Sequence, residues 1–156
     1  MCLEIKFPRA DNILTIENTF QNCTNLVTVD LSNLKLNDTN SWLETFSNCP
    51  KLQTIYVADD FINKSVSSRN TFYNCTSLVG GSGTKYDSTF IDSTGVRIDG
   101  GVSNPGYFTA ISQKPIETVQ TNSKATTNEV RSVEAPVKEP NELETDSKQN
   151  ESESQQ

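Results

Sequence analysis

The sequence of 156 residues contains no histidine, and only 8% of its residues are aromatic. Without histidine, serine and cysteine nucleophiles lack their usual general base, and zinc lacks one of its common ligands. Asp87, Asp92 and Asp99 also lack the residue spacing of a calcium-binding loop. We therefore expect no catalytic residue, no metal site and no cofactor, and we expect that the protein is not an enzyme.

Clusters of basic residues and long apolar runs are also lacking. The chain carries 13 basic and 20 acidic residues, a net charge of −7, whereas nucleic-acid binding requires clustered lysine and arginine. No apolar stretch approaches the roughly 20 residues that span a bilayer. The opening M-C-L-E-I-K-F-P also lacks the basic and apolar regions of a signal peptide. We expect neither a nucleic-acid partner nor a membrane-spanning segment.

Phenylalanine, tryptophan, tyrosine, cysteine and glycine are all absent from residues 110–156. This part is rich in serine, threonine, glutamate, lysine, asparagine, glutamine and proline. Such a composition cannot bury enough apolar surface to offset the entropy lost on ordering. It predicts a disordered acidic tail over residues 112–156.

A repeat dominates the remainder of the chain. Three segments follow one another at a fixed offset of 26 residues and share the pattern T-F-x-N-C-x-x-L: N-T-F-Q-N-C-T-N-L (18–26), E-T-F-S-N-C-P-K-L (44–52) and N-T-F-Y-N-C-T-S-L (70–78). Self-similarity at a period of about 20–50 residues is typical of solenoids, whose units bury their apolar faces against their neighbours.

Each leucine of the pattern begins an apolar alternation of period two, which indicates a strand. Val29 and Leu31 follow Leu26 in this way, and the same spacing recurs after Leu52. Shifting this pattern back by one full repeat predicts a first strand over residues 1–5, with Leu3 and Ile5 pointing inward. The Phe and Cys of T-F-x-N-C are spaced as on one face of a helix, which predicts a short helical turn in each repeat.

Together these features predict an α/β fold: a short solenoid with one strand and one short helical turn per repeat. The extended pattern T-F-x-N-C-x-x-L-x-T-h-x-h, where h is apolar, resembles the BspA-type leucine-rich repeat family of bacterial surface proteins. Residues 77–109 resemble the module that closes such arrays. The resemblance implies a repeat array over 1–79 that starts in mid-repeat, a capping module over 80–111, and an extracellular or cell-surface location.

The capping module is expected to be rich in hairpins, because apolar residues recur there between turn signals. Gly80, Gly81 and Gly83 permit positive φ and a sharp change of direction. Tyr107 and Phe108 are expected to fold back onto the last repeat. Nothing caps the first strand, so we expect the chain to be a fragment of a longer repeat protein.

The in-phase cysteines Cys23, Cys49 and Cys75 are expected to form a column of buried thiols that behave as small apolar groups. A disulfide between neighbouring repeats is the alternative, although three residues in a column can form only one pair. Cys2 lies one full repeat before Thr28 and is expected to be exposed. Asn22, Asn48 and Asn74 are also in phase, which suggests a structural role such as hydrogen bonding to the loop backbone.

The outward residues of the strands offer a candidate protein-binding face. We expect Glu4, Asp30 and Tyr56 to form one column, Thr28 and Thr54 the next, and Gln53 to flank them. Tyr56 is the strongest candidate contact, because exposed aromatic side chains dominate binding hot spots. By the family resemblance, the partner would be a protein ligand such as host extracellular matrix or another cell surface. The alternative is a purely structural terminal segment.

Overall fold

The computed structural model describes residues 3–65 and 68–117, and it has an α/β fold with almost no helix. The chain divides into two units, Met1–Pro115 and Ile116–Gln156. The first unit extends beyond residue 111, where we expected the folded part to end. Most of the expected tail, residues 118–156, lies outside the described residues, as does Cys2.

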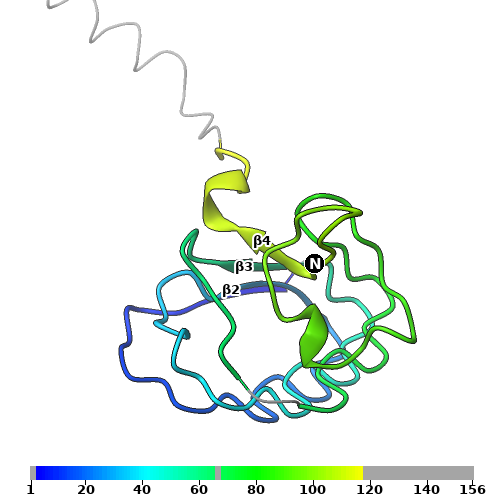
Figure 1. Cartoon of the computed structure of the whole chain (residues 1–156), viewed down its shortest axis with the longest axis horizontal. Helices are drawn as coiled ribbons and strands as arrows, with labels where there is room; N and C mark the ends of the chain where they lie inside the picture. The colour runs from blue at the N-terminus through cyan, green and yellow to red at the C-terminus, as the bar shows by residue number, and fades with distance from the viewer. Residues whose placement is uncertain (1–2, 66–67, 118–156) are drawn as a thin grey trace, which may run out of the picture. The chain divides into compact units, whose positions relative to one another are not determined.

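The folded unit is built on a four-stranded parallel sheet whose strands lie in chain order, as Figure 1 shows. The strands are β1 (Leu3–Lys6), β2 (Leu26–Asp30), β3 (Thr54–Val57) and β4 (Phe108–Ala110). Two 3₁₀ turns complete the regular elements, η1 (Ser93–Gly95) and η2 (Ile111–Gln113). Parallel neighbours in chain order require a crossover between each pair, and the repeat turns supply the first two crossovers.

The predicted register is confirmed between β2 and β3. Thr28 lies opposite Thr54, Val29 opposite Ile55 and Asp30 opposite Tyr56, so that each residue faces its counterpart one full repeat later. Because side chains alternate across a strand, Val29 and Ile55 point inward and are fully buried.

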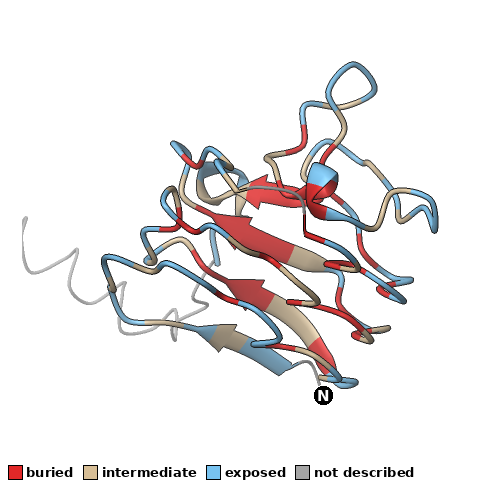
Figure 2. Ribbon diagram, turned by 60° about the horizontal axis from the view of Figure 1, so that its bottom comes forward, coloured by how far each residue is buried: buried red, intermediate tan, exposed pale blue. Residues whose placement is uncertain are grey.

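The predicted register of β1 is wrong. Ile5 lies opposite Val29 and Lys6 opposite Asp30, with an irregularity between Leu3 and Glu4. Leu3 is 47% exposed instead of buried, on a strand at the edge of the sheet. Figure 2 shows β1 as the least buried strand of the sheet.

The shifted register arises because the link from strand to turn is shorter in the first repeat than in the second. Ala10 bridges Leu34, whereas Thr39 Oγ1 already donates to the Ile13 carbonyl at the full repeat spacing. Fewer residues therefore separate Ala10 from Ile13 than separate Leu34 from Thr39. The strand before this link, β1, is therefore shifted along β2 by the number of residues that the link lacks.

The predicted helical turns are also wrong, because the T-F-x-N-C segments fold as consecutive tight turns. Positive φ angles recur within them and interrupt any helix. Asparagine, which tolerates this conformation better than most residues, supplies most of these positions. They are Asn18, Asn22, Glu44, Asn48, Asn70 and Asn74.

Backbone hydrogen bonds join the turns of successive repeats. The amides of Phe20 and Asn22 donate to the carbonyls of Thr45 and Ser47, at 2.9 and 2.8 Å. The amide of Phe46 donates to the Thr71 carbonyl in the same way, at 2.9 Å. Intervening amides, such as those of Gln21 and Cys23, donate within the turn to the residue three positions earlier, so each turn satisfies its backbone groups partly locally and partly against the next repeat.

Side chains of the same motif repeat this stacking. The Phe20 and Phe46 rings lie 5.3 Å apart and nearly parallel, and Phe46 and Phe72 lie 5.8 Å apart. On the surface, Asn48 Nδ2 donates to Asn22 Oδ1 and Asn74 Nδ2 donates to Asn48 Oδ1, at 3.1 and 3.2 Å. The in-phase asparagines thus have a structural role, but through their left-handed backbone and this side-chain ladder and not through the expected hydrogen bonds to the loop backbone.

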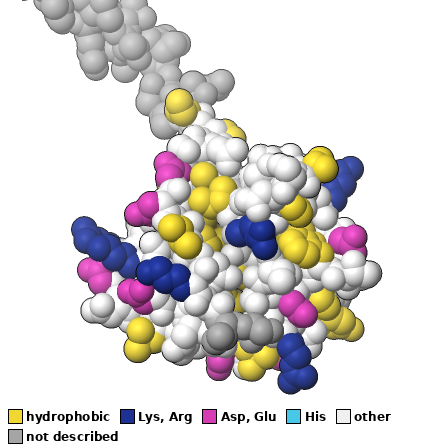
Figure 3. All heavy atoms as spheres, in the orientation of Figure 1, with side chains coloured by type: hydrophobic (Ala, Val, Ile, Leu, Met, Phe, Trp, Pro, Cys, Tyr) yellow, Lys and Arg dark blue, Asp and Glu magenta, His cyan; other side chains and the backbone are white. Residues whose placement is uncertain are grey.

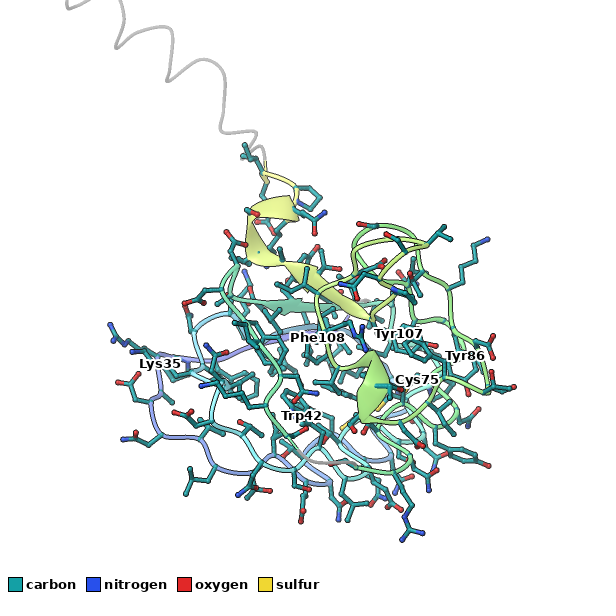
Figure 4. All side chains as sticks on the ribbon, viewed as in Figure 1. Lys35, Trp42, Cys75, Tyr86, Tyr107 and Phe108 are labelled. Carbon is teal, nitrogen blue, oxygen red and sulfur yellow. The ribbon has the colours of Figure 1, made fainter. Side chains whose placement is uncertain are left out.

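The segment after Leu78 leaves the sheet and returns as β4. Ile55 lies opposite Phe108 and Tyr56 opposite Thr109. The predicted packing of Tyr107 and Phe108 on the last repeat is confirmed, because both are fully buried and their rings lie 4.9 and 6.2 Å from that of Phe72. Figure 4 shows Phe108 and Trp42 in the interior, with Tyr107 on the side of Cys75 and Tyr86.

The expected hairpin-rich cap is instead made largely of turns. In the described cap residues the antiparallel pairing consists of one isolated bridge, between Val79 and Lys85. Of these three glycines, which permit positive φ, Gly83 adopts it, at +97°. Gly80 is needed for space, since a Cβ there would collide with the Gly106 carbonyl oxygen.

Candidate binding face

The outward side of the sheet brings five of the six predicted face residues onto neighbouring strands, and the sixth, Gln53, lies beside them. Asp30 and Tyr56 share a column, and Thr28 and Thr54 share the next, as expected. Glu4 lies opposite Thr28 instead of Asp30, because of the shifted register of β1. Gln53 immediately precedes β3 and is exposed.

Lys114, which the sequence did not single out, lies on this face. Its ammonium nitrogen is 2.9 Å from Glu4 Oε1 and 3.0 Å from Asp30 Oδ2. It also lies 4.9 Å from the centroid of the Tyr56 ring, within the range of a cation–π contact. Lys114 comes directly after η2, which follows β4 (Figure 1). Residues from both ends of the folded unit therefore meet on the outward face.

The charges of this cluster stabilise one another. Burial alone would lower the pKa of Lys114, but its hydrogen bonds to Glu4 and Asp30 outweigh that effect and raise the pKa. Burial would likewise raise the pKa of Asp30, but hydrogen bonds from Ser32 and Lys114 lower it. Both groups are therefore charged at neutral pH.

The expectation that Tyr56 is an exposed contact is wrong in this structure. Tyr56 is 9% exposed and Asp30 is 8% exposed. Lys114 lies over the Tyr56 ring and bonds Asp30. Thr28 and Thr54 remain partly exposed. The accessible part of the face thus lies around the two threonines, Glu4 and Gln53.

The three in-phase cysteines are free thiols in the structure. Cys49 Sγ donates to the Phe20 carbonyl and Cys75 Sγ to the Phe46 carbonyl, each at 3.0 Å. Burial raises the pKa of Cys49 to about 11 and that of Cys75 to about 12. Cys23 is only partly buried, so the column of buried thiols comprises two of the three residues.

The aspartates of the cap organise its turns. Asp99 is the centre of this arrangement: its carboxylate accepts hydrogen bonds from the amides of Ser82, Thr84 and Gly101. Asp87 accepts from the amide and hydroxyl of Thr89. Within residues 3–65 and 68–117, no group of three or more candidate ligand side chains is placed to hold a metal ion.

Elsewhere on the molecule, the face seen in Figure 3 intersperses basic and acidic side chains. In the part of the chain that the structure describes, no helix is long and apolar enough to cross a membrane. Comparison of the chain with models of protein families, with curated proteins and with solved structures gave no match.

Proposed function

We propose that this chain is a short leucine-rich-repeat solenoid of the BspA type, and that it serves as a surface-exposed module that binds a protein ligand without catalysis. Its location would be extracellular or on a bacterial cell surface. The common register of strands β2 and β3, of the stacked rings and of the turn hydrogen bonds supports the solenoid. The partner would be a protein of the extracellular matrix or of another cell surface.

The observation that carries this proposal is the outward face of the sheet. Thr28 and Thr54 lie side by side in register and partly exposed, next to Glu4 and the exposed Gln53. A parallel sheet holds these side chains at fixed spacings of about 4.8 Å between strands. Such a surface is pre-organised, so a partner loses little free energy in ordering it.

A non-catalytic role agrees with how the acidic side chains are used. Asp99 and Asp87 accept hydrogen bonds from turn amides and hydroxyls. Asp92 accepts from the Asn70 amide at 2.8 Å. Carboxylates engaged in this way support the backbone and are not aimed together at a substrate position.

Binding of the full chain to surfaces coated with collagen, fibronectin or laminin tests the proposal. Thr54→Arg places a bulky cation on the outward face and should weaken binding about tenfold or more, the effect of losing roughly 1.4 kcal/mol. Ser88→Arg, an exposed change in the cap, should leave binding unchanged. Equal binding by both variants and the unmodified chain would reject the outward face as the binding surface.

The second candidate function is architectural: closing the end of a repeat array. The cap favours this architectural function, because cap residues accept the hydrogen bonds that a further repeat would otherwise accept from the last one. The amides of Phe72 and Asn74 donate to the Ile91 carbonyl at 2.8 Å and to the Tyr86 hydroxyl at 3.2 Å. If no coated surface retains the chain while the cap proves essential for folding, this second function is the better explanation.

A further inference from the structure

The cluster of Glu4, Asp30 and Tyr56 combines two carboxylates with an aromatic ring, and a lysine ammonium group of the same chain occupies it. Each member comes from a different strand, β1, β2 or β3. We infer that this cluster is a recognition site for a lysine side chain of the protein partner, and that Lys114 is its intramolecular occupant. This inference rests on the proposed protein-binding function of the outward face.

The geometry selects a primary ammonium group over a guanidinium group. Asp30 Oδ1 already accepts from the amide and hydroxyl of Ser32, at 3.0 and 2.6 Å. Only Oδ2 is directed to Lys114. A guanidinium group binds carboxylates best through two parallel hydrogen bonds to both oxygens. A compact ammonium group needs only one acceptor oxygen from each carboxylate. Lys114 donates to one oxygen of Glu4 and to one oxygen of Asp30.

The receptor is held in place independently of its occupant. The two Ser32 hydrogen bonds fix the Asp30 carboxylate from its own strand end. The β2–β3 register places the backbone of Tyr56 directly beside that of Asp30. Glu4 also pairs with Lys6, at 3.7 Å. Withdrawal of Lys114 would therefore leave a pre-formed site instead of a collapsed one.

The segment that carries Lys114 is lightly attached. None of the residues of η2 is buried. Beyond residues 111–114 themselves, the hydrogen bonds described for this segment are those of Lys114, one from the Ser112 amide to Asp59 Oδ1 at 3.0 Å, and one from the Ala110 amide of β4 to Gln113 Oε1 at 3.2 Å. A lysine side chain of a partner can therefore displace residues 111–114 by replacing a few polar contacts at the surface.

The test uses the full-length chain with Lys114→Met, which keeps the apolar stem and removes the charge. The probes are Nα-acetyl-lysine amide, the arginine analogue and the norleucine analogue, which lacks the ammonium group. Binding is followed by NMR shifts of the Asp30 and Tyr56 amides. Lys35→Met is the matched control, since Lys35 is exposed and projects at the periphery in Figure 4.

The lysine probe should bind Lys114→Met at least about tenfold more tightly than it binds the unmodified chain or Lys35→Met, because an occupied site lowers apparent affinity. The arginine probe should bind more weakly and the norleucine probe not at all. Adding Glu4→Gln should abolish the gain. Lys114→Gln provides the same vacancy if Lys114→Met does not fold.

Equal responses of Lys114→Met and Lys35→Met to the lysine probe would overturn the inference, as would equal binding of lysine and norleucine probes. Failure here is distinguishable from failure of the proposed function. Binding to a coated surface that Thr54→Arg weakens, with no response to the lysine probe, rejects only the lysine site. A response to the lysine probe without any retention on coated surfaces rejects the proposed function and leaves the site standing.

Discussion

At the scale of the residue, the T-F-x-N-C motif assigns a separate physical task to each recurring position of the repeat. In the second copy, Thr45 Oγ1 donates to the Ile16 carbonyl at 3.0 Å, and Phe46 stacks between two rings. Asn48 adopts a positive φ, and Cys49 donates to the Phe20 carbonyl. The motif is therefore a set of contacts between repeats, and its thiol is a structural group.

Alkylation of the folded protein with iodoacetamide at pH 8 tests the structural role of the thiols. With pKa values of about 11 and about 12, the thiolate fractions of Cys49 and Cys75 at pH 8 are about one in a thousand and one in ten thousand. We expect Cys23, which is partly exposed, to react well before either. Peptide mapping by mass spectrometry identifies the order, and modification of Cys75 as fast as Cys23 would contradict the burial.

Asp99 provides the second prediction at this scale. Burial alone would raise the pKa of its carboxyl, but hydrogen bonds from Thr84, Gly101 and Ser82 lower it below the ordinary value of 3.8. A lowered pKa in the folded state contributes stability that is present above the ordinary value and is lost as the pH falls through the folded-state value. Asp99→Asn should cost roughly 1–3 kcal/mol at neutral pH, because buried donors lose their acceptor.

Urea unfolding of the Asp99→Asn variant from pH 7 down to pH 3 measures this effect. The unmodified protein should lose stability below about pH 4, and Asp99→Asn should lose less over the same range. Asp87→Asn is the matched control, because Asp87 is exposed and the described hydrogen bonds of its carboxylate are only with its neighbour Thr89. Identical pH profiles for Asp99→Asn and the unmodified chain would exclude the proposed role of Asp99.

At the scale of the element, β4 joins the cap to the repeats through Phe108. Its ring contacts those of four aromatic residues that belong to the repeats, and it is fully buried. The ring centroids lie 5.3 to 6.5 Å away, in Phe61, Trp42, Phe72 and Phe46. One side chain of a three-residue strand thus closes the apolar interior.

Phe108→Ala should destabilise the folded unit by roughly 3–5 kcal/mol, the range for removing a buried ring. Phe90→Ala is the control from the same cap: Phe90 is only partly buried and its described ring contact is with Tyr107, at 5.2 Å. Its effect should be clearly smaller. Urea unfolding curves compare the two variants, and equal losses would show that Phe108 has no special role in joining cap and repeats.

The repeat spacing was sufficient to predict β2, β3 and their register, because inward residues such as Val29 and Ile55 recur at a fixed offset. The repeat spacing failed to predict the register of β1, because the first repeat is shorter. Phe7, an aromatic residue to which the sequence pattern assigned no role, was the available signal of that different register. Phe7 packs against Phe20 at 6.0 Å. β4 was unpredictable because the residues after Leu78 lose the apolar alternation and rejoin the sheet only at Phe108.

Strand alternation predicted which residues form the candidate face, but it did not predict that Lys114 covers Tyr56 and bonds Asp30. Lys114 lies in a polar stretch whose composition predicted disorder, and nothing local marks it as a contact. Its position depends on β4 joining the sheet and on η2 reaching Glu4 and Asp30, which are 110 and 84 residues away in sequence. Contacts at such separations are set by tertiary structure and not by local pattern.

At the scale of the whole folded unit, strands β2 and β3, the ring stack and the turn hydrogen bonds follow from one repeat register, whereas β1 is shifted against it and β4 joins the sheet from the cap. The outward face inherits its side-chain spacing from that register, and both proposed functions depend on it. A register of this kind also predicts which backbone amides are protected from solvent, since each turn donates to the next repeat.

Amide hydrogen exchange of the full chain, resolved by NMR, tests this register most directly. The amides of Phe20, Asn22, Phe46 and Asn48, which donate to the following repeat at 2.8 or 2.9 Å, should be protected together and lose protection only on global unfolding. Exposed amides without a described backbone partner, such as that of Ser88, should exchange freely. Rapid exchange at Phe46 and Asn48 in the folded protein would contradict the repeat-to-repeat hydrogen bonding on which the fold and both proposed functions depend.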